Sequence, residues 1–133
     1  MAQQLCEQGF DRSRPAIVSW LGVTQYLSVE AIRSTLVTLG SLGPPIELVM
    51  TYALPALREH PAAEFFTPRA AVGEPWTTFF TPEDIARLVE QAGMTIIEDV
   101  AYAKDSIGSS LWQRSDALVP HELPRLVLAT TAA

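Results

Sequence analysis

Apolar residues along this chain occur in two spacings that alternate from one end to the other. Two segments carry apolar residues three and four positions apart, which predicts one amphipathic helix after Ser28 and another after Thr81. Short, nearly continuous apolar runs predict buried strands at 17–21, 46–54, 94–100 and 123–130. The predicted order is therefore strand, helix, strand, long loop, helix, strand, strand.

Both predicted helices carry start and stop signals. Ser28 is a suitable N-cap for the first helix, and Gly40 together with Gly43-Pro44-Pro45 stops it. Thr81 caps the second helix, Pro82 occupies its first position, and Gly93 ends it. These signals place the helix ends within narrow limits.

The alternation of strand and helix predicts an α/β fold with a parallel sheet and right-handed crossovers. The last two strands have no strong helix signal between them. The mixed sequence of residues 103–118 is compatible with a short helix as an alternative. We therefore expect a mostly parallel sheet with an antiparallel final strand. The length of 133 residues predicts a single domain, 1–133, in which the segment 55–80 is a lid-like excursion with a helical turn near 56–60.

The charge, the hydropathy and the numbers of cysteine and histidine residues argue against several classes of protein. The net charge of −6 and the scattered arginines argue against nucleic acid as a partner, because phosphate binding needs clustered cations. Cys6 is the only cysteine, so no internal disulfide is expected. No apolar run approaches the roughly 20 residues of a membrane span, and no signal peptide is recognised, so we expect no membrane association and a cytoplasmic location. His60 and His121 lack further ligands at suitable spacing, so no metal site is predicted.

The end of the first predicted strand is the strongest candidate for a binding site. That strand reaches Gly22, and three polar residues, Thr24, Gln25 and Tyr26, follow before the helix. In open α/β sheets, ligands bind outside the carboxyl ends of the strands. A small-molecule site and a purely structural turn both remain open on this pattern.

These same residues carry a family resemblance. Gly9-Phe10-Asp11, Pro15 and the run Ser-Trp-Leu-Gly-Val-Thr-Gln-Tyr-Leu at 19–27 resemble the fourth-strand signature of the leucine carboxyl methyltransferase family, which includes polyketide O-methyltransferases and many actinobacterial paralogues. The resemblance continues through 74–76 and 79–80 and ends at 125–129. It implies an S-adenosylmethionine-dependent enzyme on a Rossmann-like class I methyltransferase sheet, of which this chain is similar to the C-terminal half.

The resemblance also implies a site. The residues expected at the methionine end of the cofactor are Leu21, Gly22 and Val23. The residues expected to bind the methyl acceptor are Thr24, Tyr26, Tyr52 and Trp76. Simple packing is the alternative for Leu21, Tyr52 and Trp76. The family often has a glutamate where Leu21 stands, so a carboxylate acceptor loses support. No catalytic residue is assigned, because methyl transfer depends mainly on positioning and on exclusion of water.

Three functions are compatible with these features to different degrees. The first is an S-adenosylmethionine-dependent O-methyltransferase for a small molecule, with this chain carrying the acceptor side of the site. The second is a non-catalytic relative that acts as an interaction module through an open sheet edge at 17–21, pairing with a second copy or with a separate N-terminal half. The third, part of a nicotinamide-dependent oxidoreductase, is disfavoured because the chain has neither G-x-G-x-x-G nor Tyr-x-x-x-Lys.

Overall fold

The computed structural model describes residues 2–43, 45–60, 75–101 and 124–132. The regular elements in these ranges are α1 (Ala2–Glu7), β1 (Ala16–Trp20), the 3-10 turn η1 (Thr24–Tyr26), α2 (Val29–Gly40), β2 (Ile46–Ala53), the 3-10 turn η2 (Pro55–Arg58), α5 (Pro82–Gln91), β3 (Thr95–Ala101) and β4 (Pro124–Thr130). The predicted strands and helices are all present, with ends within about two residues of the prediction. The expected lid lies largely outside the described residues, as does the segment 103–118.

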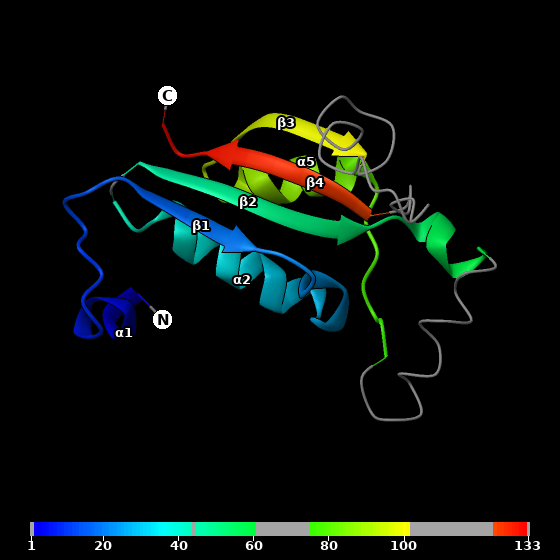
Figure 1. The fold of residues 1–133 in the computed structure, drawn as a ribbon, viewed down its shortest axis with the longest axis horizontal. Helices are drawn as coiled ribbons and strands as arrows, with labels where there is room; N and C mark the ends of the chain where they lie inside the picture. The colour runs from blue at the N-terminus through cyan, green and yellow to red at the C-terminus, as the bar shows by residue number, and fades with distance from the viewer. Residues whose placement is uncertain (1, 44, 61–74, 102–123, 133) are drawn as a thin grey trace, which may run out of the picture.

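The four strands form one mixed sheet in the order β1-β2-β4-β3 (Figure 1). β1 and β2 are parallel, and β4 runs antiparallel to both β2 and β3. The α/β prediction with an antiparallel final strand is therefore confirmed. The order of elements along the chain did not specify that β4 would lie between β2 and β3. In this position β4 pairs with both of these earlier strands and keeps them apart.

Both long helices cover the same face of the sheet (Figure 1). Ile32 and Leu36 from α2, and Ile85 and Val89 from α5, are fully buried. They pack with sheet residues that include Leu48 into a single hydrophobic core. Each such side chain contributes about 1.5–3 kcal/mol relative to leaving it in water. The apolar stripes predicted from the sequence therefore form the layer between the helices and the sheet.

The predicted helix caps are present. The side chain of Ser28 accepts a hydrogen bond from the backbone N–H of Ala31. Thr81 and Asp84 form a reciprocal capping box at the start of α5. Gly93 follows α5 in the left-handed region, with a φ of 75°.

The ends of α2 and α5 approach each other closely at Gly40. A β-carbon added to Gly40 would lie 1.9 Å from the carbonyl oxygen of Ala92. Gly40 is the last residue of α2 and its φ is not positive, so the structure gives this glycine a packing role: no larger residue allows the two backbones to come so near.

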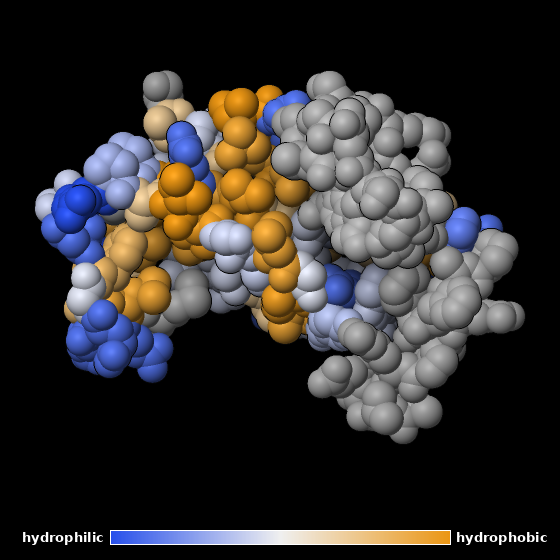
Figure 2. Space-filling view, viewed as in Figure 1, coloured by the Kyte–Doolittle hydropathy of each residue, from blue (hydrophilic) through white to orange (hydrophobic). Residues whose placement is uncertain are grey.

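The other face of the sheet is not covered by any described helix. Ile17 on β1 is 74% exposed and Ile97 on β3 is 60% exposed. Figure 2 shows hydrophobic side chains gathered on this side of the molecule. Within the described residues, β1 pairs with β2 alone and so forms an edge of the sheet. No helix in the described part of the chain is long and apolar enough to cross a membrane.

Candidate functional site

The connection between β1 and α2 is held in place by Gly22 and Thr51. Gly22 has a φ of 68°, which favours glycine, and its backbone N–H donates to Oγ1 of Thr51 at 2.8 Å. A β-carbon added to Gly22 would find no atom within 4 Å. The hydrogen bond to Thr51 thus attaches the turn to β2, and the space beside Gly22 stays open to a ligand.

The two residues that flank Gly22 expose their side chains. Leu21 is 47% exposed and Val23 is 40% exposed. Apolar side chains on both sides of an accessible glycine offer a surface for an aliphatic group. The methionine part of S-adenosylmethionine has a short aliphatic chain between its sulfonium and its charged amino-acid group, and only that chain suits an apolar surface of this kind.

Thr24 and Gln25 face inward and stabilise the turn. Thr24 is buried, and its hydroxyl donates to the carbonyl oxygen of Thr51 at 2.8 Å. The side-chain amide of Gln25 donates to the carbonyl oxygen of Gly22 at 2.9 Å. With its hydroxyl committed and only 1% of its surface exposed, Thr24 supports the turn in this structure and does not line an open surface.

Tyr26 and Trp76, which are distant in the sequence, lie side by side. The carbonyl oxygen of Gln25 accepts a hydrogen bond from the backbone N–H of Thr77 at 2.8 Å, which ties the segment before α5 to the turn after β1. The ring centroids of Tyr26 and Trp76 are consequently 6.2 Å apart, with the planes at 89°. Such an edge-to-face pair is favourable and rigid. The structure therefore brings two predicted acceptor residues together.

The aromatic cluster continues from Trp76 to Phe79. Their ring centroids are 6.4 Å apart. The guanidinium carbon of Arg58, at the end of η2, lies 4.4 Å from the centre of the Phe79 ring. This cation–π contact adds a positive charge beside the aromatic rings. Arg58 was not singled out from the sequence, because a lone arginine after a proline-led turn carries no distinctive pattern.

Tyr52, which was predicted either to line the acceptor site or to pack in the core, is packed in the core. It is 1% exposed, and its hydroxyl donates to Oδ2 of Asp99 at 2.7 Å. Nε of Arg125 donates to Oδ1 of the same carboxylate at 2.7 Å, and Nη2 of Arg125 donates to the Asp99 carbonyl oxygen at 2.8 Å. The three residues form a chain of hydrogen bonds across β2, β4 and β3.

Burial, followed by the hydrogen bond to Asp99, raises the pKa of the Tyr52 phenol above its ordinary value. Tyr52 therefore remains protonated, and serves as a donor, well beyond neutral pH. The sequence signal for this network was the presence of Asp99 and Arg125 within predicted strands, where an unpaired buried charge would be costly.

No group of three or more potential metal ligands occurs in the described ranges. Of the predicted site residues, Leu21, Gly22, Val23, Tyr26 and Trp76 lie around the carboxyl end of β1. Thr24 lies within the same turn, and Tyr52 lies beneath the carboxyl end of β2.

The four-stranded sheet, with α2 and α5 packed on one of its faces, forms a mixed α/β fold. A DUF574 family protein from Streptomyces avermitilis MA-4680 superposes with a TM-score of 0.65 at 15% identity, over 92% of this chain and 47% of that one. Magnesium protoporphyrin IX methyltransferase from Synechocystis PCC 6803, solved with bound SAH, superposes with a TM-score of 0.51 at 13% identity, over 86% of this chain and 43% of that one. The chain thus spans less than half the length of either structure.

Residues 1–40 match the model of the leucine carboxyl methyltransferase family. This range contains the run at 19–27 from which the resemblance was inferred, so the resemblance to that family is confirmed. No curated protein matches the sequence. The chain is therefore methyltransferase-like in fold, and its first 40 residues are similar to the leucine carboxyl methyltransferase family.

Proposed function

We propose that this chain provides the acceptor side of an S-adenosylmethionine-dependent O-methyltransferase site that acts on a small molecule. The single observation that carries the proposal is the turn after β1. It combines an open glycine at the carboxyl end of a strand, exposed apolar neighbours and an adjacent aromatic pair. The fold shared with a methyltransferase solved with bound SAH supports the assignment.

The proposed roles follow from the positions of the side chains. Leu21 and Val23 would contact the methionine chain of the cofactor, and Gly22 would let that chain approach the backbone. Tyr26 and Trp76 would form an aromatic wall beside the positively charged sulfonium, where a ring face is favourable. S-adenosylmethionine supplies the activated methyl group. This chain would orient the acceptor oxygen and exclude water. Thr24 would hold the turn in place, and Tyr52 would stabilise the end of β2 beside it.

Calorimetric titration of S-adenosylmethionine into the 133-residue chain tests this proposal. We expect saturable binding that Gly22→Ala weakens by about tenfold or more, because the added methyl group occupies the space beside the turn. Gly9→Ala is the matched control. Gly9 also has a positive φ, of 96°, and open space around it, but it precedes β1 and lies away from the turn. Its variant should bind within about twofold of the original chain.

Two results would overturn the proposal. One is a folded chain that produces no binding heat at millimolar S-adenosylmethionine. The other is equal weakening by Gly22→Ala and Gly9→Ala, which would trace the loss to backbone strain instead of contact with the ligand. Circular dichroism of each variant establishes that the chain is folded before the titration.

The open edge at β1 favours a second function, that of an interaction module. The edge strand carries the largely exposed Ile17, and unpaired strand edges are ready sites for pairing with another chain. The partner would be a second copy or a separate N-terminal half. Sedimentation equilibrium should show association that Ile17→Lys weakens and that Ile97→Lys, on the opposite edge strand, leaves largely unchanged. A monomer at all concentrations would exclude the second copy.

A further inference from the structure

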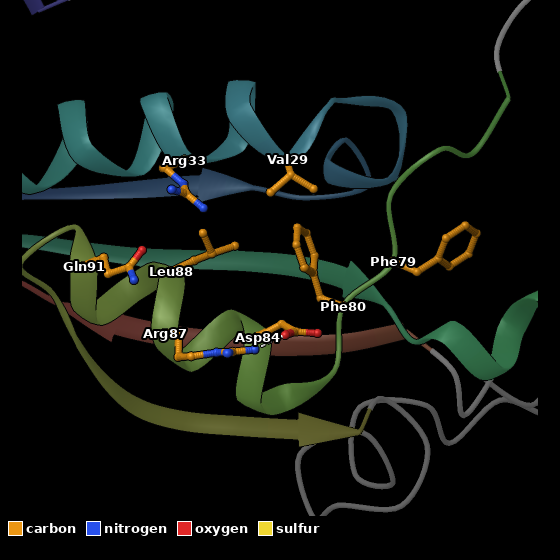
Figure 3. A pocket seen from close by; sticks show the side chains of 8 residues that line it. All are labelled: Val29, Arg33, Phe79, Phe80, Asp84, Arg87, Leu88 and Gln91. Atoms are coloured by element: carbon orange, nitrogen blue, oxygen red, sulfur yellow. Dashed lines mark hydrogen bonds and ion pairs between the residues drawn. The ribbon is translucent and has the colours of Figure 1, made fainter.

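A pocket of about 410 Å³ lies between α2 and α5, on the helical side of the sheet (Figure 3). Its volume falls within the range of roughly 300–1,000 Å³ that small-molecule sites occupy. It is distinct from the turn at Gly22. Its lining comes from the first turns of α2, from most of the length of α5 and from the two phenylalanines before α5.

The apolar wall of the pocket consists of Val29, Phe80 and Leu88, whose side chains point toward one another in Figure 3. Phe80 and Leu88 are 5% and 6% exposed, so they belong to the packed core. The backbone N–H of Phe80 donates to the carbonyl oxygen of Ala53 at 3.0 Å, which holds this residue against the end of β2. The wall is therefore rigid on the α5 side. Val29, which is 43% exposed, closes it from α2.

The polar rim carries two arginines in different states. Arg87 forms an ion pair with Asp84, whose carboxylate is also part of the capping box of α5. Hydrogen bonds from the backbone N–H and the hydroxyl of Thr81, followed by Arg87, lower the pKa of Asp84. Its carboxylate is therefore ionised at neutral pH and keeps Arg87 engaged.

Arg33 differs from Arg87. Nowhere in the described ranges does a residue form a hydrogen bond or an ion pair with its guanidinium group. In Figure 3 its side chain extends from α2 toward the pocket, above Leu88. An available guanidinium next to a fixed apolar wall is the combination that recognises an anion with an apolar body.

We propose that this pocket binds a small organic monoanion, a carboxylate attached to an aliphatic or aromatic body. Arg33 receives the carboxylate, and the apolar body packs against Val29, Phe80 and Leu88. The planar guanidinium presents paired donors that match a carboxylate.

The charge of the lining favours a monoanion. The lining contains Arg33, Arg87 and Asp84, so two positive charges and one negative charge leave a net charge of +1. A singly charged carboxylate neutralises this charge, whereas a phosphate dianion would leave the occupied pocket with a net negative charge. A neutral alcohol of the same length leaves Arg33 without a partner. The proposal does not depend on the methyltransferase assignment, and its test uses no S-adenosylmethionine.

Titration of octanoate into the chain, followed through the methyl resonances of Val29 and Leu88, tests the proposal. We expect saturable shifts at both residues. Octan-1-ol should bind at least about tenfold more weakly, because it lacks the charge-assisted hydrogen bond to Arg33. Arg33→Gln should weaken octanoate binding by a similar factor. Arg14→Gln removes the same charge from an exposed position outside the pocket and should stay within about twofold.

Any of four results would overturn the proposal: no octanoate shifts at Val29 and Leu88, equal affinity for octan-1-ol and octanoate, equal affinity of Arg33→Gln and Arg14→Gln, or tighter binding of inorganic phosphate than of octanoate. Val29→Trp is a second variant that fills the pocket from an exposed position and so keeps the core intact. It should abolish the Leu88 shifts, and their persistence would place octanoate elsewhere.

Discussion

The backbone N–H of Gly22 and Oγ1 of Thr51 are joined by a hydrogen bond of 2.8 Å. The carbonyl oxygen of Thr51 also accepts a hydrogen bond from Thr24, so one residue of β2 holds the turn after β1 at two points. The bond from Thr24 is buried, and the bond from the exposed Gly22 is partly buried. The position of the candidate cofactor-binding turn is therefore set by the neighbouring strand.

Thr51→Val should lower the free energy of unfolding by about 1–2 kcal/mol, because it removes the acceptor for the Gly22 N–H while keeping the side-chain volume. Thr51→Ser keeps the hydroxyl and should cost less. Urea denaturation followed by circular dichroism measures both. Equal stability of Thr51→Val and the original chain would show that the hydrogen bond does not hold the turn.

Gly40→Ala and Gly22→Ala should destabilise the chain for different reasons and by different amounts. At Gly22 only the positive φ opposes alanine, with a cost of about 1–2 kcal/mol. At Gly40 the new β-carbon would meet the Ala92 carbonyl at 1.9 Å, which forces α2 and α5 apart. Overpacking of this kind costs about 1–3 kcal/mol or more, and it cancels the advantage that alanine normally has within a helix.

Thermal unfolding of the two glycine variants should therefore place Gly40→Ala below Gly22→Ala. The reverse order would contradict the close approach of the helix ends. Gly93 has a φ of 75° and open space around it, so Gly93→Ala measures the loss of stability that a positive φ causes without a steric clash.

Tyr52→Phe should remove a stabilising contribution that depends on pH. Burial and the hydrogen bond to Asp99 raise the pKa of Tyr52 in the folded chain above its ordinary value of 10.0. Its contribution is therefore complete below pH 10 and declines as the pH rises above 10, where the unfolded chain ionises first. Between pH about 10 and the raised folded value, this group lowers the free energy of unfolding by about 1.4 kcal/mol per pH unit.

The stability of the original chain should therefore fall more steeply with alkaline pH than that of Tyr52→Phe. Urea unfolding at a series of pH values from about 8 to about 11 measures both slopes. Parallel slopes would mean that Tyr52 ionises equally in the folded and unfolded chain. Tyr26→Phe, at a half-buried position, is the matched control.

The Asp99–Arg125 pair should show coupling in a double-mutant cycle. The two side chains are 15% and 21% exposed, and their charged atoms lie 2.7 Å apart. Arg125→Met leaves the Asp99 carboxylate without its cation and should cost about 2–4 kcal/mol, more than Asp99→Asn. In Asp99→Asn/Arg125→Met the losses should be less than additive by about 1 kcal/mol or more. Additive losses would show that the pair does not contribute as a unit.

The methyltransferase resemblance was recognisable from the sequence because its residues recur in the same order and at similar spacing from Gly9 to Ala129, with the longest run at 19–27. The run at 19–27 contains the strand end, the glycine and Tyr26, so the sequence locates the turn, whereas its hydrogen bonds to Thr51 appear only in the folded chain. Trp76 was a candidate only through the resemblance. Its contact with Tyr26 depends on the hydrogen bond from Thr77 to Gln25, which no local pattern specifies.

The sequence by itself determined the strands, the helices and their caps, because these depend on hydrophobic periodicity and on residues within one turn of each end. Only the tertiary structure decided which strands became neighbours. The insertion of β4 between β2 and β3 places Arg125 beside Asp99, whose carboxylate also accepts the hydrogen bond from Tyr52, so that a residue expected near the acceptor becomes part of a buried network. The packing of α2 beside α5 likewise created the pocket at Arg33. Contacts of this kind depend on the register and packing of elements that lie far apart in the chain.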